Sequence, residues 1–191
     1  MSAGHLGTVA TAGATIWLTG LSGAGKSTIA EALVPRLRTA GHRVDILDGD
    51  EVRQVLTADL GFSREDRITN VRRIGYVAEV LSRNGVLTLV PVIAPYAEAR
   101  DSVRERHEKA GTPYVEIHIA TSVDLCAQRD VKGLYAKQRA GQLSSLTGVD
   151  DPYEDPANPD LRLDTAGRTL DECVDAVWAV LAARGIVPGT R

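Results

Sequence analysis

Residues 20–27 read Gly20-Leu-Ser-Gly-Ala-Gly25-Lys26-Ser27 and match the phosphate-binding pattern G-x-x-x-x-G-K-[ST] at every fixed position. The apolar run Thr15–Thr19 precedes this loop and is typical of a buried strand, and a helix is expected from Ser27 to about Ala40. A loop between a strand and a helix can turn its backbone N–H groups toward phosphate oxygens, and the positive end of the helix dipole adds to them. The sequence therefore predicts a site for a nucleoside triphosphate.

Individual residues of the phosphate-binding loop have expected roles in binding the nucleotide and Mg²⁺. Lys26 should reach the β- and γ-phosphates and act in catalysis, and the hydroxyl of Ser27 should coordinate Mg²⁺. A guanine-reading N/T-K-x-D motif is missing from the sequence, which argues against a GTPase switch, and a motor ATPase generally needs a larger domain. A small-molecule kinase fits best. The residues expected to bind ATP in the loop are Gly20, Ser22, Gly23, Ala24, Gly25, Lys26, Ser27 and Thr28.

Strand-like and helix-like segments alternate along the chain, which indicates an α/β fold with a parallel sheet of about five strands and helices on both faces. Residues 1–13 are small and polar and are expected to form a flexible segment before a single kinase domain at 14–191. The glycine- and proline-rich stretch at about 130–160 is expected to be irregular and to serve as a lid. Strands are expected at 15–19, 43–47, 86–93, 114–120 and 162–165, and helices at 27–40, 51–60, 63–83, 97–110, after Thr121 or Ser122, and at 169–183.

The composition is that of an ordinary globular protein and excludes several classes of partner. The 191 residues are 43% hydrophobic and carry a formal net charge of −3, so we expect neither a nucleic-acid nor a membrane partner. No apolar run has the length of a membrane span, and the first residues lack the pattern of a signal peptide. Cys126 and Cys173 are not in CxxC spacing, which favours reduced thiols over a disulfide or metal site. We expect a cytoplasmic protein.

A second group of polar residues follows the second expected strand, in Leu47-Asp48-Gly49-Asp50-Glu51-Val52-Arg53. The carboxyl ends of parallel strands face one crevice, so these carboxylates should approach the phosphate-binding loop. A carboxylate there can orient an acceptor hydroxyl, accept its proton or help to hold Mg²⁺. The alternative is a plain Asp-Gly turn with solvated acids.

The next segment combines one aromatic side chain with several that bind anions. Arg67 and Asn70 are three residues apart and so share one face of a helix. Phe62 can stack on a nucleobase while an arginine holds a phosphate or sulfate. The alternative is the ordinary start of an amphipathic helix.

Taken together, the chain resembles the adenylyl-sulfate kinase family over roughly residues 14–165. Arg129-Asp-x-Lys-Gly-Leu-Tyr135 and Asp59-Leu-Gly-Phe-Ser-x-Glu-Asp-Arg67 are far more specific than the phosphate-binding loop. The resemblance implies the P-loop nucleoside-triphosphate hydrolase fold, a homodimer, and transfer of the γ-phosphoryl group of ATP to the 3′-hydroxyl of adenosine 5′-phosphosulfate. The products would be 3′-phosphoadenosine 5′-phosphosulfate and ADP, in sulfate assimilation. The matching segments are Gly20–Thr28, Leu47–Arg53, Asp59–Arg73, Pro95–Tyr96, Arg129–Tyr135 and Thr147–Tyr153.

The resemblance also implies a role for individual residues. Asp50 would be the catalytic or Mg²⁺-organising carboxylate near the 3′-hydroxyl, with Ser27 as the other metal ligand. Arg129 would pack near the adenine of ATP, and Lys132 would enter the site as the lid closes. Phe62 would lie against the adenine of the acceptor. The remaining residues expected to bind the acceptor are Arg53, Arg67, Asn70, Ile93, Ala94 and Leu146.

Two positions depart from the family pattern. Many members have Ser before the Pro-Tyr pair, where this chain has Ala94, so a phosphorylated intermediate at this position is impossible and direct in-line transfer is expected. Many members have Phe where this chain has Leu146, which removes a stacking face. These departures leave open a kinase for another nucleotide-like metabolite. The other alternative is a non-catalytic nucleotide-binding regulator, which the intact Lys26, Ser27 and Asp50 disfavour.

Overall fold

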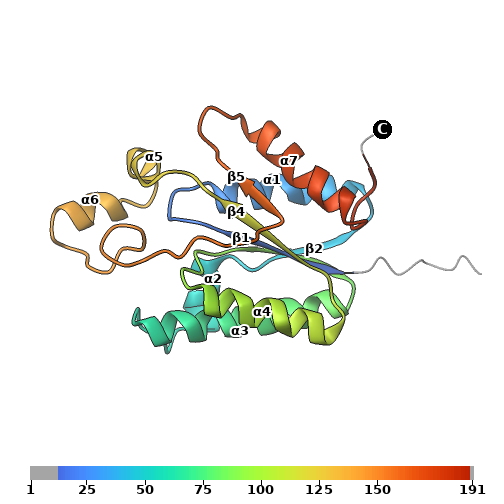
Figure 1. Ribbon diagram of the computed structural model, residues 1–191, viewed down its shortest axis with the longest axis horizontal. Coiled ribbons are helices and arrows are strands. Elements are labelled where there is room, and N and C mark those ends of the chain that lie inside the picture. The colour runs from blue at the N-terminus through green and yellow to red at the C-terminus, as the bar shows by residue number, and fades with distance from the viewer. Residues whose placement is uncertain (1–12, 190–191) are drawn as a thin grey trace, which may run out of the picture.

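The computed structural model describes residues 13–189 and contains one five-stranded sheet between two layers of helices (Figure 1). All neighbouring strands are parallel, in the order β2-β3-β1-β4-β5. Because the order reverses around the central β1, the loops after β1 and β3 flank one crevice at the carboxyl ends of the strands. The strands are β1 (Ala14–Thr19), β2 (Arg43–Ile46), β3 (Val86–Pro91), β4 (Tyr114–Ile119) and β5 (Leu161–Leu163).

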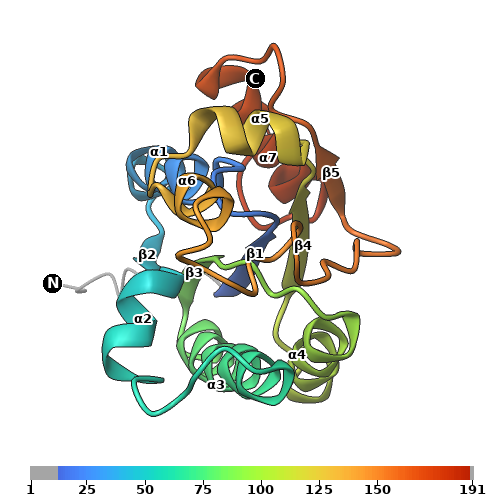
Figure 2. The same cartoon turned by 90° about the vertical axis from the view of Figure 1, so that its left-hand side faces the viewer.

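The helices cover both faces of the sheet, as expected for a parallel sheet (Figures 1 and 2). Helices α1 and α7 pack against each other on one face, and α3 and α4 form a pair on the other. One apolar core lies under each layer. The helices are α1 (Lys26–Thr39), α2 (Gly49–Val55), α3 (Arg64–Arg83), α4 (Ala97–Ala110), α5 (Val123–Arg129), α6 (Leu134–Arg139) and α7 (Leu170–Ala183).

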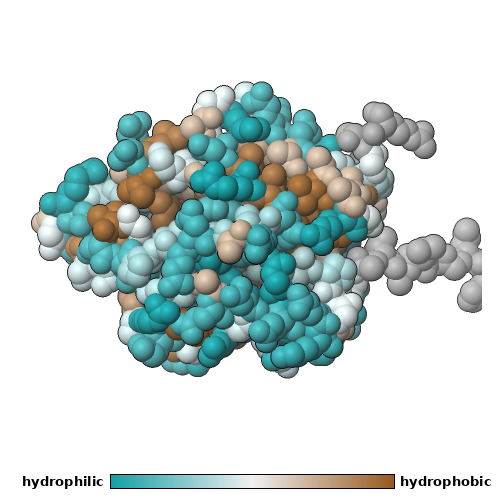
Figure 3. All heavy atoms as spheres, in the orientation of Figure 1, coloured by the Kyte–Doolittle hydropathy of each residue, from teal (hydrophilic) through white to brown (hydrophobic). Residues whose placement is uncertain are grey.

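The three inner strands are buried along their whole length, which suits the mostly apolar sequences of β1 and β3. Strand β4 also carries two buried polar residues, Glu116 and His118. Strand β2 lies at one edge, and its burial alternates between half-buried and exposed. The predicted α/β fold with a parallel five-stranded sheet is confirmed. The face of the molecule shown in Figure 3 is mostly polar, with apolar side chains gathered near α5 and α6 and again over α7.

Side-chain caps set the starts of four helices, α2, α3, α5 and α7. The hydroxyl of Ser63 accepts a hydrogen bond from the N–H of Asp66 and begins α3. Thr169 and Glu172 form a complete capping box at α7. The sequence predicts that α5 begins after Thr121 or Ser122, and Ser122 caps it by accepting from the N–H of Leu125.

Helices α3 and α4 approach closely because Gly75 has no side chain. A Cβ atom at Gly75 would lie 2.4 Å from a methyl carbon of Val103 on α4. Both residues are buried in the core beneath this helix pair. The glycine therefore permits the close packing of α3 on α4.

Four elements differ from the sequence expectation by two residues or more. Strand β3 ends at Pro91, two residues before the end of the expected strand at 86–93. Helix α2 begins two residues earlier and ends sooner than the expected helix at 51–60, because the Asp48 side chain accepts from the N–H of Asp50 and so starts the helix. The expected irregular lid contains α6, whose first N–H groups, those of Tyr135 and Ala136, donate to the carboxylate of Asp130. Strand β5 ends at Leu163, two residues before the expected end.

The predicted N-terminal segment at 1–13 lies outside the described residues except for Gly13, so its flexibility stays a prediction, as does the motion of the lid. Among residues 13–189, no helix combines the length and the apolar character needed to cross a bilayer.

Candidate active site

The phosphate-binding loop joins β1 to α1, and its glycines are required by the backbone geometry. Gly20 has a φ of 148°, and a Cβ atom there would lie 2.4 Å from the carbonyl oxygen of Ile119. Gly23 has a φ of 78°, and its Cβ would lie 3.0 Å from the carbonyl oxygen of Cys126. Neither position admits an ordinary side chain. The loop is therefore fixed against β4 and α5.

Lys26 begins α1, and its side chain is folded into the loop. The residue is 8% exposed, and its ammonium donates to the carbonyl oxygen of Leu21 at 2.7 Å. Burial lowers the pKa of Lys26 to about 8, and the positive charge of Lys132 contributes in the same direction. A buried ammonium held by one neutral carbonyl is poised to bind an anion, because a phosphate would supply the missing counter-charge.

The carboxylates after β2 reach the loop. The hydroxyl of Ser27 donates to Oδ2 of Asp48 at 2.7 Å, and Oδ1 of Asp48 accepts from the N–H of Asp50 at 2.9 Å. Asp50 itself forms an ion pair with Lys132 from the lid. The sequence predicts Ser27 and Asp50 as ligands of one Mg²⁺ ion, which stays a prediction, and the structure adds a direct contact between Ser27 and Asp48.

The ends of α5 and α6 lie against the phosphate-binding loop. The hydroxyl of Tyr135 donates to the carbonyl oxygen of Ser22 at 2.9 Å. The guanidinium of Arg129 donates to Oγ1 of Thr165 at 2.9 Å and lies 3.5 Å from the carbonyl oxygen of Ala24. The predicted ATP-side residue Arg129 is thus beside the loop. Thr28, by contrast, is exposed on α1.

Where the acceptor is predicted to bind, two arginines flank an exposed aromatic ring. Phe62 is 64% exposed. The Arg53 guanidinium lies 4.3 Å from the centre of its ring and that of Arg67 lies 5.7 Å away. Burial, and next the charge of Arg67, lower the pKa of Arg53. The pair therefore presents positive charge beside an open aromatic face.

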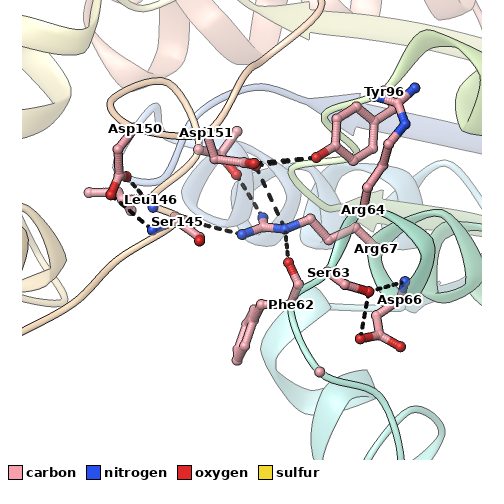
Figure 4. A network of polar contacts seen from close by, with 12 residues as sticks. Phe62, Ser63, Arg64, Asp66, Arg67, Tyr96, Ser145, Leu146, Asp150 and Asp151 are labelled. Carbon is pink, nitrogen blue, oxygen red and sulfur yellow. Dashed lines mark hydrogen bonds and ion pairs between the residues drawn. The ribbon is translucent and has the colours of Figure 1, made fainter.

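Arg67 also joins α3 to the lid (Figure 4). Its guanidinium donates to the carbonyl oxygen of Phe62 at 2.9 Å, to Oγ1 of Thr147 at 2.8 Å and to the carbonyl oxygen of Ser145 at 2.7 Å. A carboxylate oxygen of Asp151 lies 3.7 Å from its Nε. The lid is therefore docked on α3 through Arg67, a residue predicted to bind the acceptor.

Asn70 and Leu146 make contacts within the protein. Oδ1 of Asn70 accepts from the buried hydroxyl of Thr57 at 2.7 Å. Leu146 is 6% exposed and belongs to the apolar core that includes Leu21, and its N–H donates to Asp150. Leu146 is thus packed inward in this structure, so its contact with an acceptor stays a prediction.

Ile93 and Ala94 follow β3 and are held by their carbonyl groups. The carbonyl oxygen of Ile93 accepts from the hydroxyl of Thr19 at 2.5 Å, and that of Ala94 accepts from Arg100 at 2.6 Å. Ala94 is 3% exposed and has a φ of 46°, which is unusual for a residue with a side chain. The short segment Ile93–Tyr96, here called the acceptor strap for its predicted role, is therefore held by hydrogen bonds from Thr19 and Arg100.

A cavity of about 520 Å³ lies between the phosphate-binding loop, the start of α5 and the returning part of the lid. Its lining includes Leu21, Val123 and Tyr153. None of the side chains predicted to bind the acceptor lines it, so this cavity is distinct from the predicted acceptor pocket.

Sequence reasoning missed several residues that organise the site. Tyr135, Thr147 and Tyr153 fall inside segments that carry the family resemblance, so the sequence signalled their segments without their contacts. Thr19 immediately precedes the phosphate-binding loop, and Thr165 follows β5; for these residues only the fold supplies the contact.

The comparisons with known proteins assign the family. The adenylylsulphate kinase family model matches residues 12–164. The chain belongs to the adenylyl-sulfate kinase family. An adenylyl-sulfate kinase from Rippkaea orientalis is 53% identical over 175 residues, which cover 91% of this chain and 93% of the relative. A probable adenylyl-sulfate kinase from Synechocystis sp. is 50% identical over 177 residues, covering 93% of this chain and 98% of the relative.

Solved structures of adenylyl-sulfate kinases share the fold. The Mycobacterium tuberculosis APS kinase CysC, in complex with AMPPNP and APS, has a TM-score of 0.85 and 47% identity, covering 88% of this chain and 97% of its own. A hexameric APS kinase from Thiobacillus denitrificans has a TM-score of 0.70 and 40% identity, covering 92% of this chain and 30% of its own. The predicted family, P-loop kinase fold and adenylyl-sulfate kinase function are confirmed.

Proposed function

We propose that the protein transfers the γ-phosphoryl group of ATP to the 3′-hydroxyl of adenosine 5′-phosphosulfate, giving 3′-phosphoadenosine 5′-phosphosulfate and ADP. The observation that carries this proposal is the hydrogen bond from Ser27 to Asp48, because it joins the phosphate-binding loop to the segment of acceptor-side carboxylates. The related M. tuberculosis enzyme was solved with AMPPNP and APS together, which supports ATP and adenosine 5′-phosphosulfate as the pair of substrates.

For ATP, we assign the triphosphate to the loop Gly20–Thr28 and to the ammonium of Lys26. The left-handed glycines and the buried ammonium support this assignment, because both create a site for an anion. We assign Arg129 to the adenine end. Its contact with Thr165, next to the loop residue Ala24, supports this position.

For the acceptor, we assign the adenine to the exposed ring of Phe62 and the phosphosulfate to Arg53 and Arg67. The open ring and the two adjacent guanidinium groups support this division. Arg53 is the freer of the two, because Arg67 already donates to the lid. The remaining acceptor contacts are assigned to Asn70, Ile93, Ala94, Lys132 and Leu146.

For Mg²⁺, the donors at hand fit the ion. The hydroxyl of Ser27 and the carboxylates of Asp48 and Asp50 are hard oxygen ligands of the kind that Mg²⁺ prefers. A bound Mg²⁺ would neutralise charge on the β- and γ-phosphates. Within residues 13–189, no cluster of three or more His, Cys, Asp or Glu side chains forms a metal site, which fits an ion held largely by the nucleotide.

The mechanism we propose is direct in-line transfer. Asp50 orients the 3′-hydroxyl and accepts its proton as the new O–P bond forms, and the bond from the γ-phosphorus to the β–γ bridging oxygen breaks to release ADP. Lys26 and Lys132 offset the negative charge that develops on the transferring group. Ala94 has no hydroxyl and is nearly fully buried, so this position supplies backbone only.

We further propose a homodimer in the cytoplasm. The two cysteines are buried free thiols, which suits a reducing compartment. Light scattering after size-exclusion chromatography would measure the mass of the assembly, and a monomer or a hexamer would contradict the dimer.

Coupled ADP release across a panel of acceptors tests the proposed reaction. Adenosine 5′-phosphosulfate should support ADP release, whereas AMP and inorganic sulfate should not. Faster release with another nucleotide-like acceptor would indicate a different substrate. Binding of ATP without acceptor-dependent ADP release would indicate a regulatory nucleotide-binding protein.

A further inference from the structure

Thr19 is the last residue of β1 and directly precedes the first glycine of the phosphate-binding loop. It is fully buried in the centre of the sheet. Its side chain is polar in an otherwise apolar strand end, and a buried hydroxyl is stable only when its hydrogen bonds are made. The hydrogen-bond partners of the Thr19 hydroxyl therefore indicate its structural role.

Both partners of Thr19 belong to parts of the site that are remote in sequence. Its Oγ1 donates to the carbonyl oxygen of Ile93 at 2.5 Å, in the acceptor strap. Its Oγ1 also lies 2.9 Å from the hydroxyl of Tyr153, in the part of the lid that returns to the sheet. A threonine hydroxyl has one proton, and Ile93 takes it, so Tyr153 is the donor in the second bond.

Tyr153 is itself held firmly. Burial raises its pKa to about 12, so the phenol stays protonated and remains a donor. The ring of His118 on β4 lies 5.8 Å from that of Tyr153, with the two planes tilted at 31°. The next residue, Glu154, accepts from Arg100 through its carbonyl oxygen at 2.6 Å. Arg100 also donates to the carbonyl oxygen of Ala94. The lid and the acceptor strap are therefore both bound to the same two side chains, Thr19 and Arg100.

We propose that Thr19 is a positioning residue that fixes the acceptor strap, and through Tyr153 the base of the lid, relative to the phosphate-binding loop. This inference rests on the proposed role of Ile93 and Ala94 in binding the acceptor. Thr19 touches neither substrate in this scheme. It acts through the backbone of Ile93, whose carbonyl oxygen it holds at the end of β1, directly before the phosphate-binding loop.

Two variants remove these bonds with little change of shape. Thr19→Val removes both hydrogen bonds, and Tyr153→Phe removes only the one from the lid. We expect Thr19→Val to raise KM for adenosine 5′-phosphosulfate by about three- to tenfold, the range for loss of an ordinary hydrogen bond, with KM for ATP changed by less than about twofold. Tyr153→Phe should show a smaller rise with the same selectivity. Thr19→Ser retains the hydroxyl and should restore the wild-type KM.

The chain offers matched controls. Thr88 on β3 and Tyr114 on β4 are also buried, and their hydroxyl groups have no hydrogen-bond partner among residues 13–189. Thr88→Val and Tyr114→Phe therefore make the same chemical changes in the same sheet without breaking a contact. Both should leave KM for either substrate unchanged.

The double variant tests the coupling. Because Thr19→Val already removes the bond to Tyr153, adding Tyr153→Phe should cause no further rise in KM for the acceptor. Additive effects, an equal rise in KM for ATP, or equal effects in the controls would overturn the inference. If Thr19→Val fails to fold, Tyr153→Phe and Thr19→Ser test the proposed role of Thr19. An unchanged KM for the acceptor in Tyr153→Phe would also overturn that role. A wild-type protein with no acceptor turnover would refute the proposed function instead.

Discussion

The hydroxyl of Ser27 donates to the carboxylate of Asp48 at 2.7 Å, across 21 residues of sequence. This bond ties the start of α1 to the end of β2. The second oxygen of Asp48 caps α2, which carries Asp50 and Arg53. One carboxylate thus sets the relative position of the phosphate-binding loop and α2.

Replacing Asp48 by Asn should lower kcat by about tenfold or more and raise the Mg²⁺ concentration needed for half-maximal rate. Asn keeps the shape and one acceptor oxygen but loses the charge that favours the metal. Magnesium titrations of the reaction measure this. Asp45→Asn is the control, because this exposed aspartate on β2 accepts, among residues 13–189, only from the N–H of the next residue. An unaltered magnesium requirement in Asp48→Asn would contradict the role.

Binding of ATP to the ligand-free enzyme should weaken as the pH rises through about 8. The pKa of Lys26 is lowered to about 8, so the ammonium loses its charge above that pH. Isothermal titration with an ATP analogue between pH 7.5 and 9.5 checks this. Lys26→Met should bind weakly at every pH, and a parallel decline in that variant would show that another group is responsible.

The same shift makes the stability of the ligand-free protein depend on pH. The unfolded chain holds the Lys26 proton up to the ordinary pKa of 10.5, whereas the folded chain releases it near 8. The unfolded state therefore binds more protons between these values, and the Lys26 contribution to the free energy of unfolding rises with pH across that window. Denaturant unfolding of the wild type and of Lys26→Met at pH 7.5 and 9.5 measures this contribution of Lys26. A difference between the two proteins that does not change with pH would argue against the shift.

Replacing Asp50 by Asn should lower kcat by about a hundredfold while KM for ATP changes little. The exchange removes the proposed proton acceptor but leaves the phosphate-binding loop intact. Lys132→Met removes the partner of Asp50 and should also reduce kcat. Steady-state kinetics with both substrates varied measures these effects. A kcat close to wild type in Asp50→Asn would remove Asp50 from the chemistry.

Gly75→Ala should destabilise the protein by about 1–3 kcal/mol, the usual cost of overpacking a core. The new methyl group would lie 2.4 Å from Val103, so α3 and α4 would have to separate. Val103→Ala combined with Gly75→Ala should recover part of the loss. Urea denaturation measures both, and an undiminished midpoint in Gly75→Ala would show that the helices repack freely.

Much of the fold was predictable because local signals coincide with tertiary needs. The apolar strands, the caps at Ser63 and Thr169 and the phosphate-binding loop all carry their structure in a few adjacent residues. Helix α6 was missed, because its start depends on the carboxylate of Asp130, which accepts from two N–H groups in the helix. The surrounding sequence is rich in proline and glycine and so predicts an irregular segment, not a short helix that begins after Asp130.

The site was predicted less completely than the fold. Sequence spacing brought the carboxylates after β2 to the loop but could not say which of them meets Ser27. The choice depends on the first turn of α2, where Asp48 faces both the loop and its own helix. The junction at Thr19 could not be predicted, since its partners lie 74 and 134 residues away in sequence.

Transfer of label from [γ-³²P]ATP to adenosine 5′-phosphosulfate, with the product identified by mass spectrometry, tests the proposed reaction most directly. The wild-type protein should place the label on the 3′-oxygen and release one ADP for each labelled product, and Lys26→Ala should form none while keeping its fold. Release of labelled inorganic phosphate without labelled nucleotide, or undiminished transfer by Lys26→Ala, would contradict the mechanism proposed for this site.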